Sequence, residues 1–225
     1  MGTTVEVTDG LRAHLAAPRQ GAGLGLLVVH DRSGVAGHIE DVCDRFASEG
    51  FTALAPDVYS GAVAEQPERA DEPGSVLESA EAARLLGAAV DHLVASPSVR
   101  GEGIGVVGFG LGARLALELS TARPSEVRAC VGFYGPAPWP PTTPTWSSLQ
   151  APVHLHLGEN DQLVAPALVG DLAAELSDLG KDVEVFIYPD AGHGFFDDRR
   201  FDSFNTGAAS LAWTRTLEFL RAKLG

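Results

Sequence analysis

The stretch GVVGFGLGARLAL, residues 105 to 117, constrains the fold more than any other segment. Its apolar start predicts a buried strand, and the alanine- and leucine-rich end favours a helix. Gly108, Gly110 and Gly112 lie between the two and indicate a tight strand-to-helix turn. In turns of this kind the middle residue is often a Ser or Cys nucleophile. Here it is Gly110, which has no side chain.

Apolar and amphipathic segments alternate on both sides of this turn. Strands alternating with helices predict a mainly parallel sheet with helices on both faces, so we expect one α/β domain over residues 1–225. Two short segments at the start alternate every second residue, which predicts antiparallel edge strands. Residues 60–74 and 136–150 are rich in Gly, Pro or both and predict loops. The expected edge strands are 3–8 and 11–18, the other strands 23–31, 51–59, 103–109, 127–135, 152–161 and 183–194, and the helices 37–50, 75–96, 111–122, 165–180 and 207–224.

The composition excludes several classes of protein. The formal net charge of the 225 residues is -14, which argues against nucleic-acid binding. No apolar run is long enough for a membrane span, and the first residues lack the pattern of a signal peptide. Two cysteines cannot form a disulfide scaffold, and no Cys/His spacing indicates zinc. We therefore expect a cytoplasmic monomer or homodimer that acts on a small molecule and needs no cofactor or metal.

Polar residues follow the ends of six predicted strands. In a parallel sheet these ends meet at one edge, where active residues gather. The order Gly110, Asp161, His193 is the order nucleophile, acid, base of α/β-hydrolases. A carboxylate on one imidazole nitrogen would leave the other nitrogen free to take a proton. The strand-end residues are Asp31, Arg32, Ser33, Asp57, Tyr59, Gly110, Tyr134, residues 159–161 and His193.

Five segments in this order resemble the dienelactone hydrolase family: residues 28–59, 105–117, 132–135, 157–164 and 190–196. The resemblance runs from about residue 10 to residue 224. It implies a small α/β-hydrolase without a large lid domain and with a Cys-His-Asp triad. In this sequence Asp161 would be the acid and His193 the base. The backbone N–H groups of Leu111 and Arg32 would form the oxyanion hole.

Three positions depart from that family's pattern. Gly110 replaces the nucleophile, and Asp31 replaces the Glu that attends it. Asp197 replaces an Arg that helps to hold the carboxylate of a dienelactone, although Arg199 and Arg200 follow closely. A second such Arg has only Arg69 as a loose counterpart. We therefore expect a substrate other than a dienelactone carboxylate.

Several side chains have both a structural and a functional interpretation. Cys43 and Cys130 lie in apolar patterns and are expected to be buried, whereas Ser33 is either a substitute hydroxyl or an ordinary loop serine. Asp31 is either a second base or substrate contact, or a cap of the next turn. Four residues are candidates for contact with substrate; they are Ser33, Tyr134, Trp139 and Arg199. For Trp139 a plain surface loop is the alternative. His30 and His38 flank the expected site, and Trp146 could help Trp139 to cover it.

Three functions fit this set of residues. His193, held by Asp161, could activate water against an ester or lactone carbonyl. An isomerase, lyase or cyclase is the second, because removing a proton beside a carbonyl needs a base and an oxyanion hole but no covalent nucleophile. His193 and Asp31 would then supply the base and the acid. A binding protein without catalysis is the third.

Overall fold

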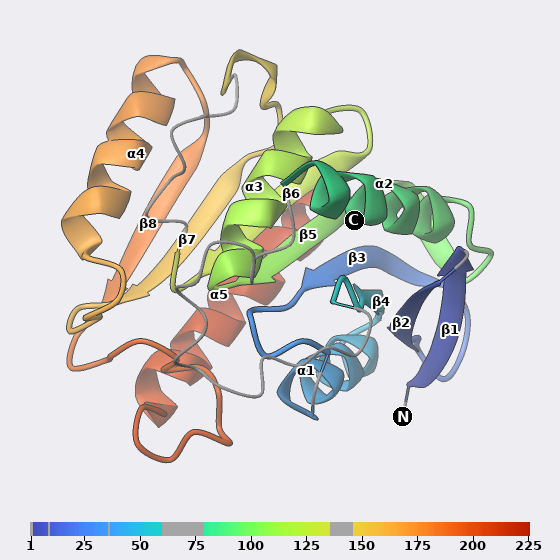
Figure 1. Cartoon of the computed structure of the whole chain (residues 1–225), viewed down its shortest axis with the longest axis horizontal. Helices are drawn as coiled ribbons and strands as arrows, with labels where there is room; N and C mark the ends of the chain where they lie inside the picture. The colour runs from blue at the N-terminus through green and yellow to red at the C-terminus, as the bar shows by residue number, and fades with distance from the viewer. Residues whose placement is uncertain (1, 9, 36, 60–78, 136–145) are drawn as a thin grey trace.

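The computed structural model describes residues 2–8, 10–35, 37–59, 79–135 and 146–225. Its centre is one eight-stranded sheet with the order β1-β2-β4-β3-β5-β6-β7-β8 (Figure 1). The six strands β4, β3, β5, β6, β7 and β8 pair in parallel with their neighbours in this order. β2 pairs in antiparallel fashion with both β1 and β4. The strands are β1 (Thr3–Thr8), β2 (Leu11–Ala16), β3 (Gly23–Val29), β4 (Phe51–Pro56), β5 (Val99–Phe109), β6 (Val127–Phe133), β7 (Val153–Gly158) and β8 (Val183–Tyr188).

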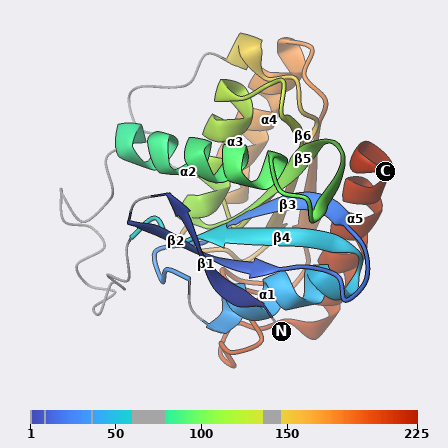
Figure 2. The ribbon, with the colours of Figure 1, turned by 90° about the vertical axis from the view of Figure 1, so that its right-hand side faces the viewer.

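Helices cover both faces of the sheet and create two apolar cores. One core joins the sheet to α2, α3 and α4, and the other joins it to α1 and α5. Figure 2 shows α2 above the strands and α1 below them. Every residue of β3 and β4 is buried, as expected for strands covered on both sides. The helices are α1 (Gly37–Ser48), α2 (Ser79–Val94), α3 (Leu111–Ala122), α4 (Pro166–Asp178) and α5 (Thr206–Leu224).

This arrangement confirms the mainly parallel α/β sheet expected from the sequence. The sequence predicted two antiparallel edge strands, but only β1 lies at the edge of the sheet. β2 lies inside the sheet, between β1 and β4. Residues 146–148 form a short 3-10 helix that the loop pattern did not predict. Its Trp146 is buried in the core beside α3 rather than covering a site. None of the helices that the structure describes is long and apolar enough to cross a membrane.

The turn between β5 and α3 brings three segments into very close contact. A Cβ atom at Gly108 would overlap the backbone carbonyl of Gly112. A Cβ atom at Gly112 would overlap the carbonyl oxygen of Val29 and lie 2.5 Å from that of His30. Real Cβ contacts of this kind do not occur, so the first turn of α3 packs against the end of β3 only because both residues are glycine.

We predict that Gly112→Ala lowers the free energy of unfolding by about 2 kcal/mol or more, because the new methyl group meets backbone that cannot move aside. Gly170 offers a matched control in α4, since nothing lies within 4 Å of a Cβ atom there. Gly170→Ala should raise stability by about 0.5–1 kcal/mol through helix propensity. Urea denaturation of both variants measures the two effects. Equal effects in α3 and α4 would contradict the packing argument.

Candidate active site

The residues expected to act together follow the carboxyl ends of the parallel strands. Asp31 comes two residues after β3, Gly110 directly after β5, and Asp161 three residues after β7. His193 follows β8 by five residues. Because these strands run parallel and adjacent, their ends share one edge of the sheet, where such folds bind ligands.

His193 and Asp161 form a hydrogen-bonded pair. Nδ1 of His193 lies 2.9 Å from Oδ2 of Asp161. The Asp161 side chain is fully buried, while the His193 side chain is 22% exposed. The backbone N–H groups of Leu163 and Val164 donate to Oδ1 of Asp161 at 2.9 and 2.8 Å. A carboxylate only accepts, so the His193 proton is on Nδ1 and Nε2 is left as the basic nitrogen.

Gly110 lies at the turn from β5 into α3 and has a positive φ. Its φ is 53° and its ψ is -118°, and α3 begins at the next residue. Its N–H donates to the carbonyl of Phe133 at 2.8 Å, and its own carbonyl accepts from Ala113 at 3.0 Å. A Cβ atom built on Gly110 has a single described neighbour within 4 Å, the Cβ of Asp31 at 3.4 Å. Position 110 therefore has room for a side chain and carries none.

Asp31 lies beside that open position and also caps the turn that follows it. Its Oδ1 accepts the N–H of Ser33 at 2.8 Å, so the capping role is present. Its second carboxylate oxygen leaves the group able to meet a ligand as well. Ser33 and Arg32 are exposed in the same turn. The structure thus brings Asp31, Ser33 and Gly110 to one edge of the sheet.

Tyr134 belongs to the scaffold beneath the site. Its ring is 5% exposed, and its hydroxyl accepts the N–H of Phe196 at 2.7 Å. Burial is the main reason that the pKa of Tyr134 lies well above its usual range. Its ring centroid is 5.2 Å from that of His193. These contacts hold the loop that carries His193, whereas the sequence suggested Tyr134 as a substrate contact.

The charged residues after His193 turn toward α1. Arg199 makes an ion pair of 2.6 Å with Asp41, and its guanidinium covers Gly37. Asp197 lies 3.2 Å from Nδ1 of His38 and accepts the N–H of Arg199 at 3.0 Å. Arg199 is therefore already paired where the sequence offered it as a substrate contact.

One group among the described residues could hold a cation. His38, Asp197 and Asp198 each bring one ligand atom to within 4.8 Å of the others. Asp198 is exposed, and the charge of Arg45 acts on it. Because Asp197 already accepts from Arg199, this group is a polar contact between α1 and the His193 loop, and we assign it no metal.

Neither cysteine is a substitute nucleophile. Both are buried and unpaired, as the apolar patterns predicted. Burial raises the pKa of the Cys130 thiol to about 12 and that of Cys43 higher still. Thiols with such pKa values carry almost no thiolate at neutral pH, and the thiolate is the reactive form.

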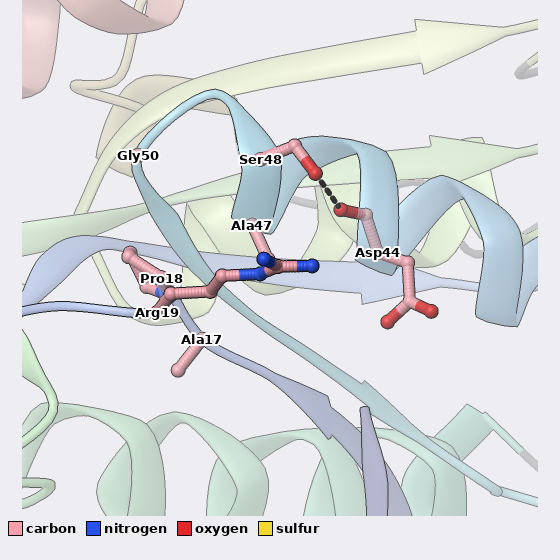
Figure 3. A pocket seen from close by; sticks show the side chains of 7 residues that line it. All are labelled: Ala17, Pro18, Arg19, Asp44, Ala47, Ser48 and Gly50. Atoms are coloured by element: carbon pink, nitrogen blue, oxygen red, sulfur yellow. Dashed lines mark hydrogen bonds between the residues drawn. The ribbon is translucent and has the colours of Figure 1, made fainter. Parts of the chain in front are cut away.

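A hollow lies at the opposite end of the parallel strands. It has a volume of about 530 Å³ and lies between α1 and the segment after β2 (Figure 3). Because Gly50 precedes β4, this hollow is at the amino ends of the parallel strands. We therefore do not place the active site there. Its lining residues are Ala17, Pro18, Arg19, Asp44, Ala47, Ser48 and Gly50.

Some expected site residues cannot be placed, and some contacts were not expected. Trp139 and Arg69 lie outside the described residues. Sequence reasoning did not find the link between Tyr134 and Phe196, because no local pattern predicts a hydrogen bond across 62 positions. It also did not find the pair of His38 and Asp197.

Comparison with known proteins decides the family. The sequence model of the dienelactone hydrolase family matches residues 11–224, which is nearly the whole chain. The chain belongs to the dienelactone hydrolase family. Its members are hydrolases, and the sheet described above is their α/β-hydrolase fold without a large added domain.

Relatives of this dienelactone hydrolase family member match over its full length. It is 31% identical to "Protein usf" of Aquifex pyrophilus, with 100% of each chain covered. It is 29% identical to a candidate carboxymethylenebutenolidase of Aquifex aeolicus, again over 100% of both chains. Among solved structures, a dienelactone hydrolase-like promiscuous phosphotriesterase from metagenomic libraries has a TM-score of 0.88 at 24% identity, covering 100% of this chain and 99% of its own. That last likeness concerns the fold alone.

We predict that Asp161→Asn reverses the tautomer of His193. The new amide can donate to Nδ1, which moves the imidazole proton to Nε2 and removes the basic nitrogen from the site. Long-range ¹H–¹⁵N NMR of the neutral imidazole reads the tautomer directly. Glu159→Gln makes the same carboxylate-to-amide change two residues away and should leave His193 unchanged. An Nδ1–H tautomer in Asp161→Asn would contradict the assignment.

Proposed function

We propose that this protein hydrolyses a small ester, lactone or related carbonyl compound with water that His193 activates directly. One observation supports the proposal: the turn at Gly110 has the positive φ expected of a nucleophile position and open space beside it, and His193 is hydrogen-bonded to Asp161. In this reading His193 and Asp161 would be the base and acid of a triad that lacks only the side chain to be acylated. A direct attack by water requires only the parts that are present.

In this reaction Nε2 of His193 takes a proton from water as the water oxygen bonds to the carbonyl carbon. The π electron pair of the carbonyl moves onto its oxygen. When the tetrahedral intermediate collapses, the bond to the leaving oxygen breaks, and that oxygen takes the proton back from His193. The products are a carboxylic acid and an alcohol, or one hydroxy acid from a lactone. Asp161 stabilises the imidazolium while the proton is on it.

The oxyanion would lie at the start of α3. Leu111 is the first residue of that helix, so its N–H is one of the donors that a helix leaves unpaired at its amino end. The helix dipole adds partial positive charge at the same place. The N–H of Arg32, in the turn after β3, would be the second donor. Preorganised donors of this kind stabilise a developing oxyanion far better than water does.

The charges around the site favour a substrate without a carboxylate. Asp31 lies beside position 110, and Asp197 stands where an arginine would be needed. Arg199 is paired with Asp41. A lactone or ester that is uncharged near its carbonyl group therefore suits this edge better than an anionic dienelactone.

Proton-transfer chemistry is the second candidate. It is favoured by the position of Asp31, whose Cβ lies 3.4 Å from the Cβ position of Gly110. His193 could remove a proton beside a carbonyl group while the Asp31 carboxyl returns one elsewhere on the substrate. Such an isomerase, lyase or cyclase would use the same oxyanion hole and would incorporate no water.

Running the reaction in oxygen-18 water distinguishes hydrolysis from proton transfer, because only hydrolysis puts solvent oxygen into the product. We expect aryl acetates and five- and six-membered lactones to give acids that carry one solvent oxygen, at rates above the spontaneous reaction. His193→Ala should reduce the catalysed rate by about 10²- to 10⁴-fold, the usual contribution of a general base. Glu159→Gln is the control. Consumption of substrate without label would favour proton transfer, and full activity in His193→Ala would exclude both candidates.

Restoring a nucleophile tests whether the rest of the site is assembled. We expect Gly110→Ser and Gly110→Cys to raise the turnover of aryl esters by about 10²-fold or more, because losing a serine nucleophile costs another hydrolase roughly a million-fold. Gly110→Ala is the matched control, since it adds the same Cβ atom and the same strain at positive φ without a nucleophile. A rapid burst of phenol should accompany the gain. Equal activity in Gly110→Ser, Gly110→Cys and Gly110→Ala would count against the proposed geometry.

A further inference from the structure

His30 is a buried histidine between the end of β3 and Asp31, and both of its ring nitrogens are engaged. The residue is 2% exposed. Its Nδ1 lies 2.6 Å from the carbonyl oxygen of Asp31. The N–H of Val58, which follows β4, points at its Nε2 at 3.3 Å. A carbonyl oxygen only accepts and an N–H only donates, so the ring is neutral with its proton on Nδ1.

The hydrogen bond from His30 acts on one particular peptide unit. The carbonyl of Asp31 and the N–H of Arg32 belong to the same peptide, which is planar and trans. The two groups therefore point in opposite directions, and fixing one fixes the other. The carbonyl is held from two sides, because the N–H of Gly34 also donates to it at 3.2 Å. The direction of the Arg32 N–H follows from these two contacts.

The same histidine also contacts the helix that carries the other candidate donor. The carbonyl oxygen of His30 lies 2.5 Å from the Cβ position of Gly112, in the first turn of α3. The backbone of His30 thus sets the distance to α3, while its side chain sets the orientation of the Asp31–Arg32 peptide. One residue connects the two segments from which an oxyanion would receive hydrogen bonds.

We propose that His30 is a positioning residue, whose neutral imidazole aims the Arg32 N–H at the oxyanion formed in the site. This inference rests on the proposed function, because it assumes an oxyanion at the amino end of α3. The tautomer that it needs is stable. Burial lowers the pKa of His30, against the hydrogen bond to Asp31 and the charges of Asp57 and Asp31. The ring of Tyr59, 5.1 Å away between centroids, packs beside it.

The tautomer can be measured without any activity. In the wild-type protein at neutral pH, long-range ¹H–¹⁵N NMR should show His30 with a proton on Nδ1 only. In His30→Leu, which removes both hydrogen bonds, the amide resonance of Arg32 should shift and exchange faster with solvent. A proton on Nε2 of His30, or an unchanged Arg32 amide, would overturn the inference.

The effect of His30 on catalysis is tested in the Gly110→Ser variant, in which we expect turnover to be large enough to measure. We expect His30→Leu to lower kcat by about tenfold or more with KM changed less than about twofold, because an oxyanion-hole donor acts mainly in the transition state. Inhibition by phenylboronic acid, whose serine adduct resembles the tetrahedral intermediate, should weaken in parallel. His30→Gln keeps an amide donor and should recover part of kcat, and it remains informative if His30→Leu does not fold.

His156→Leu is the matched control. His156 is also buried, its Nδ1 lies 2.8 Å from the Tyr188 hydroxyl, and its Nε2 lies 3.3 Å from that of Thr216. Its loss should lower the melting temperature but leave kcat and boronate inhibition within about twofold, because it contacts neither oxyanion donor. Equal kcat losses in His30→Leu and His156→Leu would overturn the role of His30 alone. If Gly110→Ser itself gains nothing over Gly110→Ala, the proposed function is the part that fails.

Discussion

The close contact between α3 and the ends of β3 and β5 determines the rest of the site. Gly108 and Gly112 allow the first turn of α3 to lie directly on the backbone of Val29 and His30. Any side chain at these positions would overlap the facing backbone and push the helix away, because backbone atoms in a packed interior cannot move aside. The contact brings the amino end of α3 and the turn after β3 together at one point. The candidate site depends on this spacing between α3 and the turn after β3.

Glycine at position 110 changes the energetics of the turn as well as its chemistry. A φ of 53° with a ψ of -118° is strained for any residue with a Cβ atom, and such strain costs about 1–3 kcal/mol. Gly110 adopts it at little cost. Position 110 therefore carries less strain than a nucleophile turn with serine or cysteine would. Gly110 offers no covalent route, so in the proposed reaction the transition state would depend on His193 and on backbone donors.

The sequence predicted the elements and the order of the site residues because both depend on local patterns. The buried strand, the glycine turn and α3 lie in one continuous segment, and the expected helix over residues 111–122 has the bounds of α3. Asp161 and His193 could be paired because each follows a strand and parallel strands end at a common edge. The role of Tyr134 could not be predicted from the sequence in this way, because a tyrosine after a strand can either contact a ligand or be buried as a support. Its bond to Phe196 depends on packing between elements 62 positions apart.

The histidine rings differ in burial: those of His30 and His156 are buried, whereas that of His193 is partly exposed. This difference determines which ring could exchange a proton with water. His156 is fully buried and hydrogen-bonded on both nitrogens, and burial lowers its pKa to about 3, so it stays neutral at ordinary pH. His30 has the same kind of environment and likewise offers no free basic nitrogen. His193 differs because, within the part of the chain that the structure describes, only its Nδ1 is bound, by a buried carboxylate, and its side chain reaches solvent. A histidine can take a proton from water only through an unoccupied nitrogen that water can reach. Of these three rings, that condition is met by His193 alone, which is why the proposed chemistry assigns the proton to it and assigns the buried rings to structure.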